Sequence, residues 1–177
     1  HTEDEVDIYN LDMEDPKVFE EFQKGNTEFV FQFGSDGMRN VLRHVKPTSI
    51  DDIAACNALY RPGSNAFIKD FVKNRQDTLN VNYLSPLLKP ILESTAGIII
   101  YQEQVLEIFK QLGGFTLEEA DNVRSVLKKT STSGKKDETY FKSLEKYKKI
   151  QAKFSKGCQE KGMTQEQVDK LLNVIKK

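Results

Sequence analysis

A short run of basic side chains is the group in this 177-residue sequence that is best suited to chemistry. Arg124 and Lys128 are four residues apart and share one face of a helix, whereas Lys129 lies about 100° around that helix from Lys128. Guanidinium and ammonium groups on one helix surface can bind the phosphates of a nucleotide. Basic residues are also common at helix C-termini, where they interact favourably with the helix dipole. Spacing alone leaves both interpretations open.

Three other residues are candidates for polar contacts with a ligand. Arg61 stands directly before Pro62-Gly63, a rigid place from which to present a guanidinium. Tyr101 and Gln104 are three residues apart, so they share a helix surface. A structural ion pair for Arg61 and a packed ring for Tyr101 are the alternative interpretations.

Other kinds of catalytic site are poorly represented. The acidic groups Asp51-Asp52, Glu118-Glu119 and Asp121 lie near expected helix starts, where the helix dipole alone favours acids. His44 is the only internal histidine, which disfavours a nucleophilic triad, and no phosphate-binding glycine loop is present. We therefore expect no catalytic residue and no metal site in this chain.

Charge is unevenly distributed along the sequence, although the net charge is only −1. Residues 128–177 contain 14 lysines and 6 acidic residues, whereas the preceding part contains 12 basic and 21 acidic residues. Such a basic C-terminal section can bind phosphates or simply form solvated lysine-rich helices.

The composition, 38% hydrophobic and 30% charged, is typical of a globular protein. No apolar run approaches the roughly 20 residues of a membrane helix, so we expect no membrane contact. The acidic start lacks the features of a signal peptide. Cys56 and Cys158 are expected to be free thiols, which indicates a reducing, cytoplasmic setting.

The sequence predicts a mainly α fold with one short β element near the N-terminus. Asp15, Pro16 and Gly25 have the positions of an N-cap, a first-turn proline and a C-terminal stop, so they delimit a short helix. Residues 29–33 alternate in polarity like a strand. Further helices are expected at about 35–45, 49–59, 64–74, 87–92, 101–112, 116–129, 138–160 and 164–177, with a flexible loop at 131–137. The candidate N-caps are Ser35, either Thr48 or Ser49, and Thr164, and either Phe115 or Thr116 precedes the helix at 116–129.

Several segments together resemble the α subunit of bacterial DNA polymerase III, a C-family replicative polymerase. They are, in order, Val30-Phe31-Gln32-Phe33, Ser35-Asp36-Gly37-Met38-Arg39, Lys46-Pro47-Thr48, Asn57-Ala58-Leu59-Tyr60-Arg61-Pro62-Gly63, Tyr101-Gln102-Glu103-Gln104-Val105 and Ala120-Asp121 followed by Arg124. The resemblance covers about residues 18–129 and continues weakly to 162. It implies a multi-helix fingers fragment over residues 1–177, with core helices at about 14–130, a loop at 131–137 and basic helices at 138–177. Gly34, Ser64 and Ala96 depart from the usual pattern and mark a divergent member.

The resemblance also implies a function, namely binding of the incoming dNTP and of primer-template DNA during replication. Arg124 and Lys129 match basic residues that would face the triphosphate, with Lys128 beside them, while Ser125 replaces a second arginine. Arg61, Tyr101 and Gln104 would be secondary contacts to nucleotide or DNA. The catalytic aspartates that hold Mg²⁺ would lie in a palm domain outside this chain, which we therefore expect to be inactive alone and to work with the palm and thumb of its parent polymerase. A non-catalytic helical module that binds nucleic acid or protein is the alternative.

Overall fold

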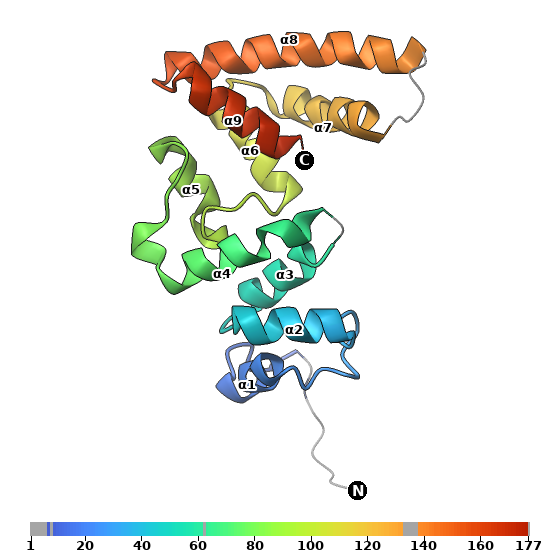
Figure 1. The fold of residues 1–177 in the computed structure, drawn as a ribbon, viewed down its shortest axis with the longest axis vertical. Coiled ribbons are helices and arrows are strands. Elements are labelled where there is room, and N and C mark those ends of the chain that lie inside the picture. The colour runs from blue at the N-terminus through green and yellow to red at the C-terminus, as the bar shows by residue number, and fades with distance from the viewer. Residues whose placement is uncertain (1–6, 8, 62, 133–137, 177) are drawn as a thin grey trace, which may run out of the picture. The chain divides into compact units, whose positions relative to one another are not determined.

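The computed structural model describes residues 7, 9–61, 63–132 and 138–176, and its chain forms two compact units (Figure 1). The N-terminal unit comprises His1–Arg75 and the C-terminal unit comprises Gln76–Lys177. The helices are α1 (Pro16–Lys24), α2 (Asp36–Val45), α3 (Ile50–Leu59), α4 (Ile68–Gln76), α5 (Lys89–Leu92), α6 (Gln102–Gln111), α7 (Leu117–Thr132), α8 (Glu138–Glu160) and α9 (Gln165–Ile175). Short 3₁₀ turns lie at Ser64–Phe67, Thr78–Asn80, Pro86–Leu88 and Glu93–Thr95.

Helix starts in the N-terminal unit follow the polar residues that the sequence places there. The side chains of Asp15, Ser35 and Ser49 accept hydrogen bonds from backbone N–H groups in the first turns of α1, α2 and α3. Gly25 ends α1 with φ 74°, a left-handed conformation that costs glycine little. The predictions of these helices from their caps are confirmed.

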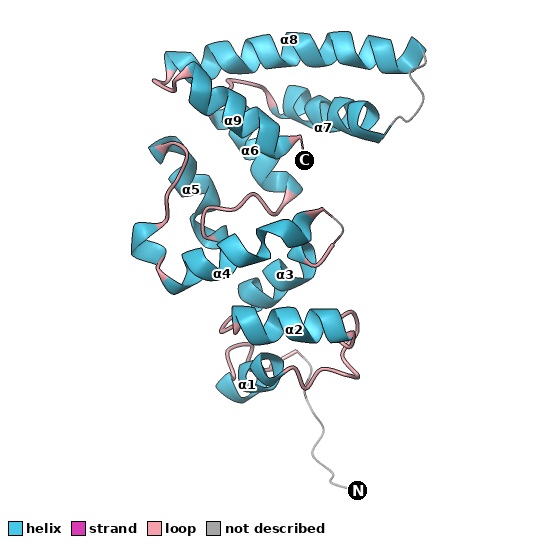
Figure 2. Ribbon diagram, in the orientation of Figure 1, coloured by secondary structure: helices cyan, strands magenta, loops and turns pink. Residues whose placement is uncertain are grey.

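The predicted β element is wrong, because no strand occurs in the part of the chain that the structure describes (Figure 2). Residues 28–33 form turns instead, closed by a hydrogen bond from the Thr27 hydroxyl to the Phe33 carbonyl at 2.8 Å. Phe33 packs edge-on against Phe22, whereas Phe29 and Phe31 are exposed. The alternation of aromatic residues therefore separates one buried ring from two exposed ones without a sheet.

The C-terminal unit is built around one hydrophobic cluster to which α5 to α9 all contribute. Phe109 of α6 lies at its centre, with its ring 5.3 Å from that of Phe115 and 4.4 Å from that of Phe154 on α8. Gly157 allows α8 to approach the turn after α6, because a Cβ atom at this position would overlap the Gly113 carbonyl. The position of α8 is thus set by aromatic packing and a close backbone approach.

The starts of α7 and α9 have polar caps, and of the two residues expected before α7 it is Thr116 that provides the cap. Thr116 and Glu119 exchange side-chain to backbone hydrogen bonds at the start of α7, and Thr164 and Gln167 do so at α9. Helix α7 continues to Thr132, two residues into the segment expected to be a loop, and the rest of that segment, 133–137, lies outside the described residues.

Two further expectations concern the membrane and the thiols. Of the described helices, none is both long enough and apolar enough to cross a membrane. Cys56 and Cys158 are free and buried. Burial raises the pKa of Cys56 to about 12 and that of Cys158 to about 11, so both thiols remain protonated at neutral pH.

Candidate functional site

Arg124 and Lys128 line a pocket of about 600 Å³ in the C-terminal unit, which we call the arginine pocket. Its other lining residues come from α6, from α7 and from the end of α9: Gln102, Val105, Leu106, Asp121, Ser125, Leu127, Ile175 and Lys176. The expected shared face of Arg124 and Lys128 therefore opens onto a cavity. Apolar side chains form part of its wall, and charged groups lie around them.

The Arg124 guanidinium is held on two sides but remains accessible. Its Nη1 donates to Gln102 Oε1 at 3.0 Å, and its Nη2 lies 3.4 Å from Asp121 Oδ1. The side chain is 57% exposed, and a guanidinium has five N–H donors, so donors remain for a ligand. The N-terminus of α6 thus orients the arginine of α7.

The side chain of Gln104, a candidate ligand contact in the sequence, is buried beneath the start of α6. Its Oε1 accepts from the backbone N–H groups of Ile100 and Tyr101 at 2.8 and 2.9 Å. Its Nε2 donates to Thr95 Oγ1 at 2.7 Å and to the Ile91 carbonyl at 3.4 Å. The amide therefore fixes the backbone at Tyr101, next to the Gln102 side chain that holds Arg124.

Lys129 lines a second pocket, of about 410 Å³, on another side of α7. We call it the lysine pocket, because Lys146 and Lys149 of α8 line it as well. Its remaining lining residues are Asn122, Ser125, Val126, Ser143 and Ile150. The structure therefore separates Lys129 from Arg124 and Lys128, in agreement with the angular offset expected along the helix. Arg61 lies in the N-terminal unit, exposed, just after α3.

Comparison with known proteins identifies the family. The model of the bacterial DNA polymerase III alpha subunit finger domain matches residues 1–162. The chain belongs to this finger-domain family. The chain is 39% identical over 96% of its length to DNA polymerase III subunit alpha of Halalkalibacterium halodurans, and 37% identical over 96% to that of Borreliella burgdorferi. It is 36% identical over 98% to the subunit of Aquifex aeolicus. The chain spans 14% of the length of each of these relatives.

Two of the acidic residues of this finger-domain chain, Asp52 and Glu119, make structural contacts. Buried Asp52 accepts hydrogen bonds from the Thr48 backbone and hydroxyl and pairs with Arg75. Glu119 of α7 pairs with Lys153 of α8, and the hydrogen bond from Lys153 lowers the pKa of the Glu119 carboxyl. Within the described ranges, no three His, Cys, Asp or Glu side chains gather closely enough to hold a metal ion.

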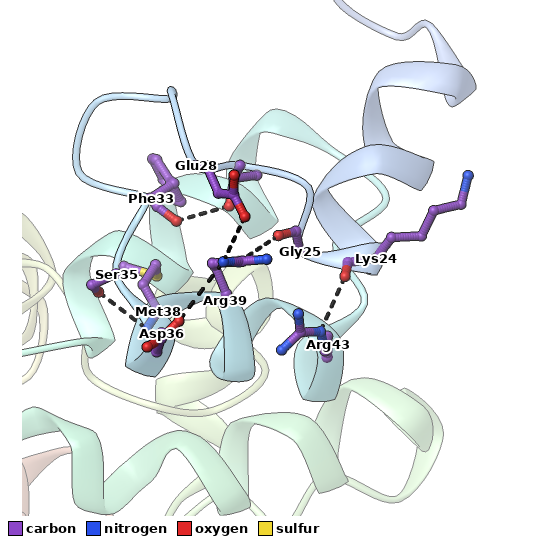
Figure 3. A network of polar contacts seen from close by, with 10 residues as sticks. Lys24, Gly25, Glu28, Phe33, Ser35, Asp36, Met38, Arg39 and Arg43 are labelled. Carbon is purple, nitrogen blue, oxygen red and sulfur yellow. Dashed lines mark hydrogen bonds and ion pairs between the residues drawn. The ribbon is translucent and has the colours of Figure 1, made fainter.

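Arg39 is the centre of a polar network that sequence reasoning missed (Figure 3). Its Nε donates to the Gly25 carbonyl at 2.8 Å, and its Nη1 lies 3.0 Å from Glu28 Oε1 and 3.7 Å from Asp36 Oδ1. One turn further along α2, Arg43 Nε donates to the Lys24 carbonyl at 3.0 Å. In the sequence, the four-residue spacing of the two arginines, which places both on one face of a helix, was the signal that could have revealed this network. The two arginines therefore attach α2 to the end of α1 and to the loop that follows α1.

Proposed function

We propose that this chain is the part of a DNA-directed DNA polymerase that binds the triphosphate of the incoming dNTP and contacts primer-template DNA. One observation carries the nucleotide half of the proposal: Arg124 is oriented by Gln102 and Asp121 at a pocket that Lys128 also lines. Membership of the finger-domain family supports a place in a replicative polymerase. DNA, the palm and the thumb of the parent polymerase are the partners in this proposal, and the cytoplasm is its setting.

The chemistry of the arginine pocket suits a phosphate chain. A guanidinium can donate two parallel hydrogen bonds to phosphate oxygens, while a lysine ammonium acts as a point charge that neutralises a neighbouring oxygen. During phosphoryl transfer, such groups offset the negative charge that develops on the transferred group. The Asp121 carboxylate lies beside the guanidinium and keeps it paired until a more strongly charged triphosphate arrives. Gln102 holds the guanidinium by a neutral contact throughout.

We assign no catalytic group to this chain, and we derive no step through a metal ion. The magnesium ligands of the parent polymerase belong, in this proposal, to residues beyond this chain. The isolated 177-residue chain should therefore be inactive. Primer extension that depends on template and Mg²⁺, catalysed by the purified chain, would contradict this assignment.

The decisive variant is Arg124→Ala, introduced into the parent polymerase. A hydrogen bond to a charged group contributes about 1.5–3 kcal/mol, so its loss should raise the KM for dNTP roughly tenfold or more. Lys148→Ala is the matched control, because Lys148 is exposed on α8 and lines neither pocket. Steady-state kinetics on a primed template measures both variants.

Two outcomes of these kinetics would count against the proposal. Unchanged KM and kcat in Arg124→Ala would remove Arg124 from the nucleotide site. If the chain bound DNA while polymerisation by the parent did not respond to Arg124→Ala, the alternative would be favoured. The chain would then be a non-catalytic helical binding module.

A further inference from the structure

The lysine pocket lies where α7 and α8 run side by side in the C-terminal unit (Figure 1). At one end of this seam, Glu119 of α7 pairs with Lys153 of α8. Toward the other end, Lys129 of α7 lines the pocket together with Lys146 and Lys149 of α8. No carboxylate is among the described residues that line the pocket. The seam therefore begins with a matched charge pair and ends with three like charges.

These lysines are not explained by local ion pairing. Lys142 and Lys156 on α8 pair with Glu138 and Glu160. By contrast, Lys129, Lys146 and Lys149 form no ion pair with any residue that the structure describes. The helix dipole accounts for Lys129, near the C-terminal end of α7, but not for lysines in the middle of α8. Gathering like charges is unfavourable, so a bound anion would stabilise this arrangement.

A buried hydroxyl gives a second, independent sign of a ligand. Ser143 lines the lysine pocket and is only 5% exposed. Its hydroxyl has no hydrogen-bond partner among the described parts of the chain, although buried polar groups are nearly always paired. A phosphate oxygen in the pocket would accept this hydrogen bond, as it would accept bonds from the surrounding ammonium groups.

We propose that the lysine pocket binds a backbone phosphate of DNA. Three lysines and a serine hydroxyl supply charge and donors for a phosphodiester. None of the described lining residues is aromatic, so the pocket offers no surface on which a base would stack. Lys129 and Arg124 open onto different pockets, which separates this site from that of the triphosphate. The inference rests on the proposed function and assigns its DNA contact to particular side chains.

The test compares two double variants of the full 177-residue chain that remove the same charge from α8. Lys146→Ala with Lys149→Ala empties the lysine pocket of two ammonium groups, whereas Lys148→Ala with Lys156→Ala removes two exposed lysines outside it. Anisotropy of a fluorescent primer-template duplex, titrated at several salt concentrations, gives the affinity and its salt dependence. Circular dichroism checks that the helices are retained.

We expect the pocket double variant to bind several-fold more weakly and to lose about one unit of the salt slope for each phosphate contact removed. The control should keep its slope. Ser143→Ala should weaken binding without changing the slope, because it removes a donor and no charge. Equal losses in both double variants, or no DNA binding by the unaltered chain, would overturn the proposal. Displacement of the duplex by inorganic phosphate, beyond the effect of chloride at equal ionic strength, would assign the pocket to a free anion and would also overturn it.

A nucleotide titration keeps this proposal distinct from the proposed function. Binding of dATP should be unchanged in the double variant Lys146→Ala with Lys149→Ala, while Arg124→Ala should weaken dATP binding and leave DNA binding intact. Loss of dATP binding in the pocket double variant would show that the lysine pocket holds the nucleotide and would overturn its assignment to DNA. If Arg124→Ala changed the binding of neither dATP nor DNA, the result would count against the nucleotide site and not against the lysine pocket.

Discussion

The loop after α1 in the N-terminal unit and the turn after α6 in the C-terminal unit are held in place by different means. In the N-terminal unit, Arg39 and Arg43 donate to backbone carbonyls at the end of α1 and in the residue after it. The loop after α1 leaves Phe29 and Phe31 exposed to solvent. In the C-terminal unit, by contrast, Phe115 and Phe154 both pack on Phe109 in a buried cluster. The loop after α1 is thus held mainly by polar anchors, with one ring contact between Phe33 and Phe22, whereas the turn after α6 is held by aromatic packing.

This difference matters for the pockets that we assign to function. Both the arginine pocket and the lysine pocket are lined by α7, which lies on the packed cluster through Ala120 and Val123. A well-packed interior resists deformation, so it fixes the direction in which α7 presents its charged side chains. The polar anchors of the N-terminal unit hold a loop instead. Variants in the two units should therefore differ in both the size and the origin of their effects.

The largest effect is expected from Phe154→Ala in the C-terminal unit. Phe154 is fully buried with its ring 4.4 Å from that of Phe109, so truncation removes buried apolar surface and leaves a cavity. We expect the free energy of unfolding to fall by about 3–5 kcal/mol. Phe141→Ala on the same helix is the control, because Phe141 is 54% exposed and its loss should cost less than about 1 kcal/mol. Urea denaturation measures both, and similar losses would refute the role of the cluster.

A smaller effect is expected from Asp52→Ala in the N-terminal unit. Asp52 is 4% exposed, and its Oδ2 accepts from the Thr48 backbone and hydroxyl and from Arg75. Removing the carboxylate leaves these donors without their acceptor, although the partly exposed Arg75 can turn to water. We expect a loss of about 2–3 kcal/mol in the free energy of unfolding.

Asp51→Ala is the control for this variant, since Asp51 lies in the same first turn and is exposed. Thermal unfolding followed by circular dichroism compares the two. Equal shifts in Tm would show that Asp52 acts only through the helix dipole, which both residues share.

Local signals made most of the helices predictable from the sequence. Asp15, Ser35, Ser49 and Thr164 cap the helices for which they were expected, because an N-cap depends only on neighbouring residues. The strand at residues 29–33 failed for the opposite reason. A strand requires a partner, and the alternating pattern gives no information about whether one exists.

At the candidate site, the contacts that could not be predicted from the sequence join side chains that are far apart along the chain. The contact between Arg124 and Gln102 joins residues 22 positions apart, and the buried amide of Gln104 reaches back to Thr95 and Ile91. Helical geometry alone separated Lys129 from Lys128, but the lysines of α8 that share its pocket were visible only as a charge bias. The sequence-based assignment of Arg124, Lys128 and Lys129 to a nucleotide stays a prediction, and our proposals keep it only for Arg124 and Lys128, which line one pocket, while Lys129 lines the other.

The smallest effect is expected from Arg39→Lys, which tests whether the polar anchors depend on the shape of the guanidinium. Arg39 donates from Nε to the Gly25 carbonyl and, from Nη1, contacts Glu28, whereas a lysine carries a single donor group that cannot reach both in the same geometry. Retaining the charge keeps the attraction to Glu28 and Asp36, so we expect a loss of only about 1 kcal/mol in the free energy of unfolding. Arg43→Lys is the matched control, because exposed Arg43 has one carbonyl contact, to Lys24, and should lose less. Hydrogen exchange of the Phe33 amide, which bonds to the Val30 carbonyl within the loop, should accelerate in Arg39→Lys more than in Arg43→Lys. Unchanged exchange in both variants would mean that the packing of Phe33 on Phe22 holds this loop, so that it and the turn after α6 would both be held by aromatic packing.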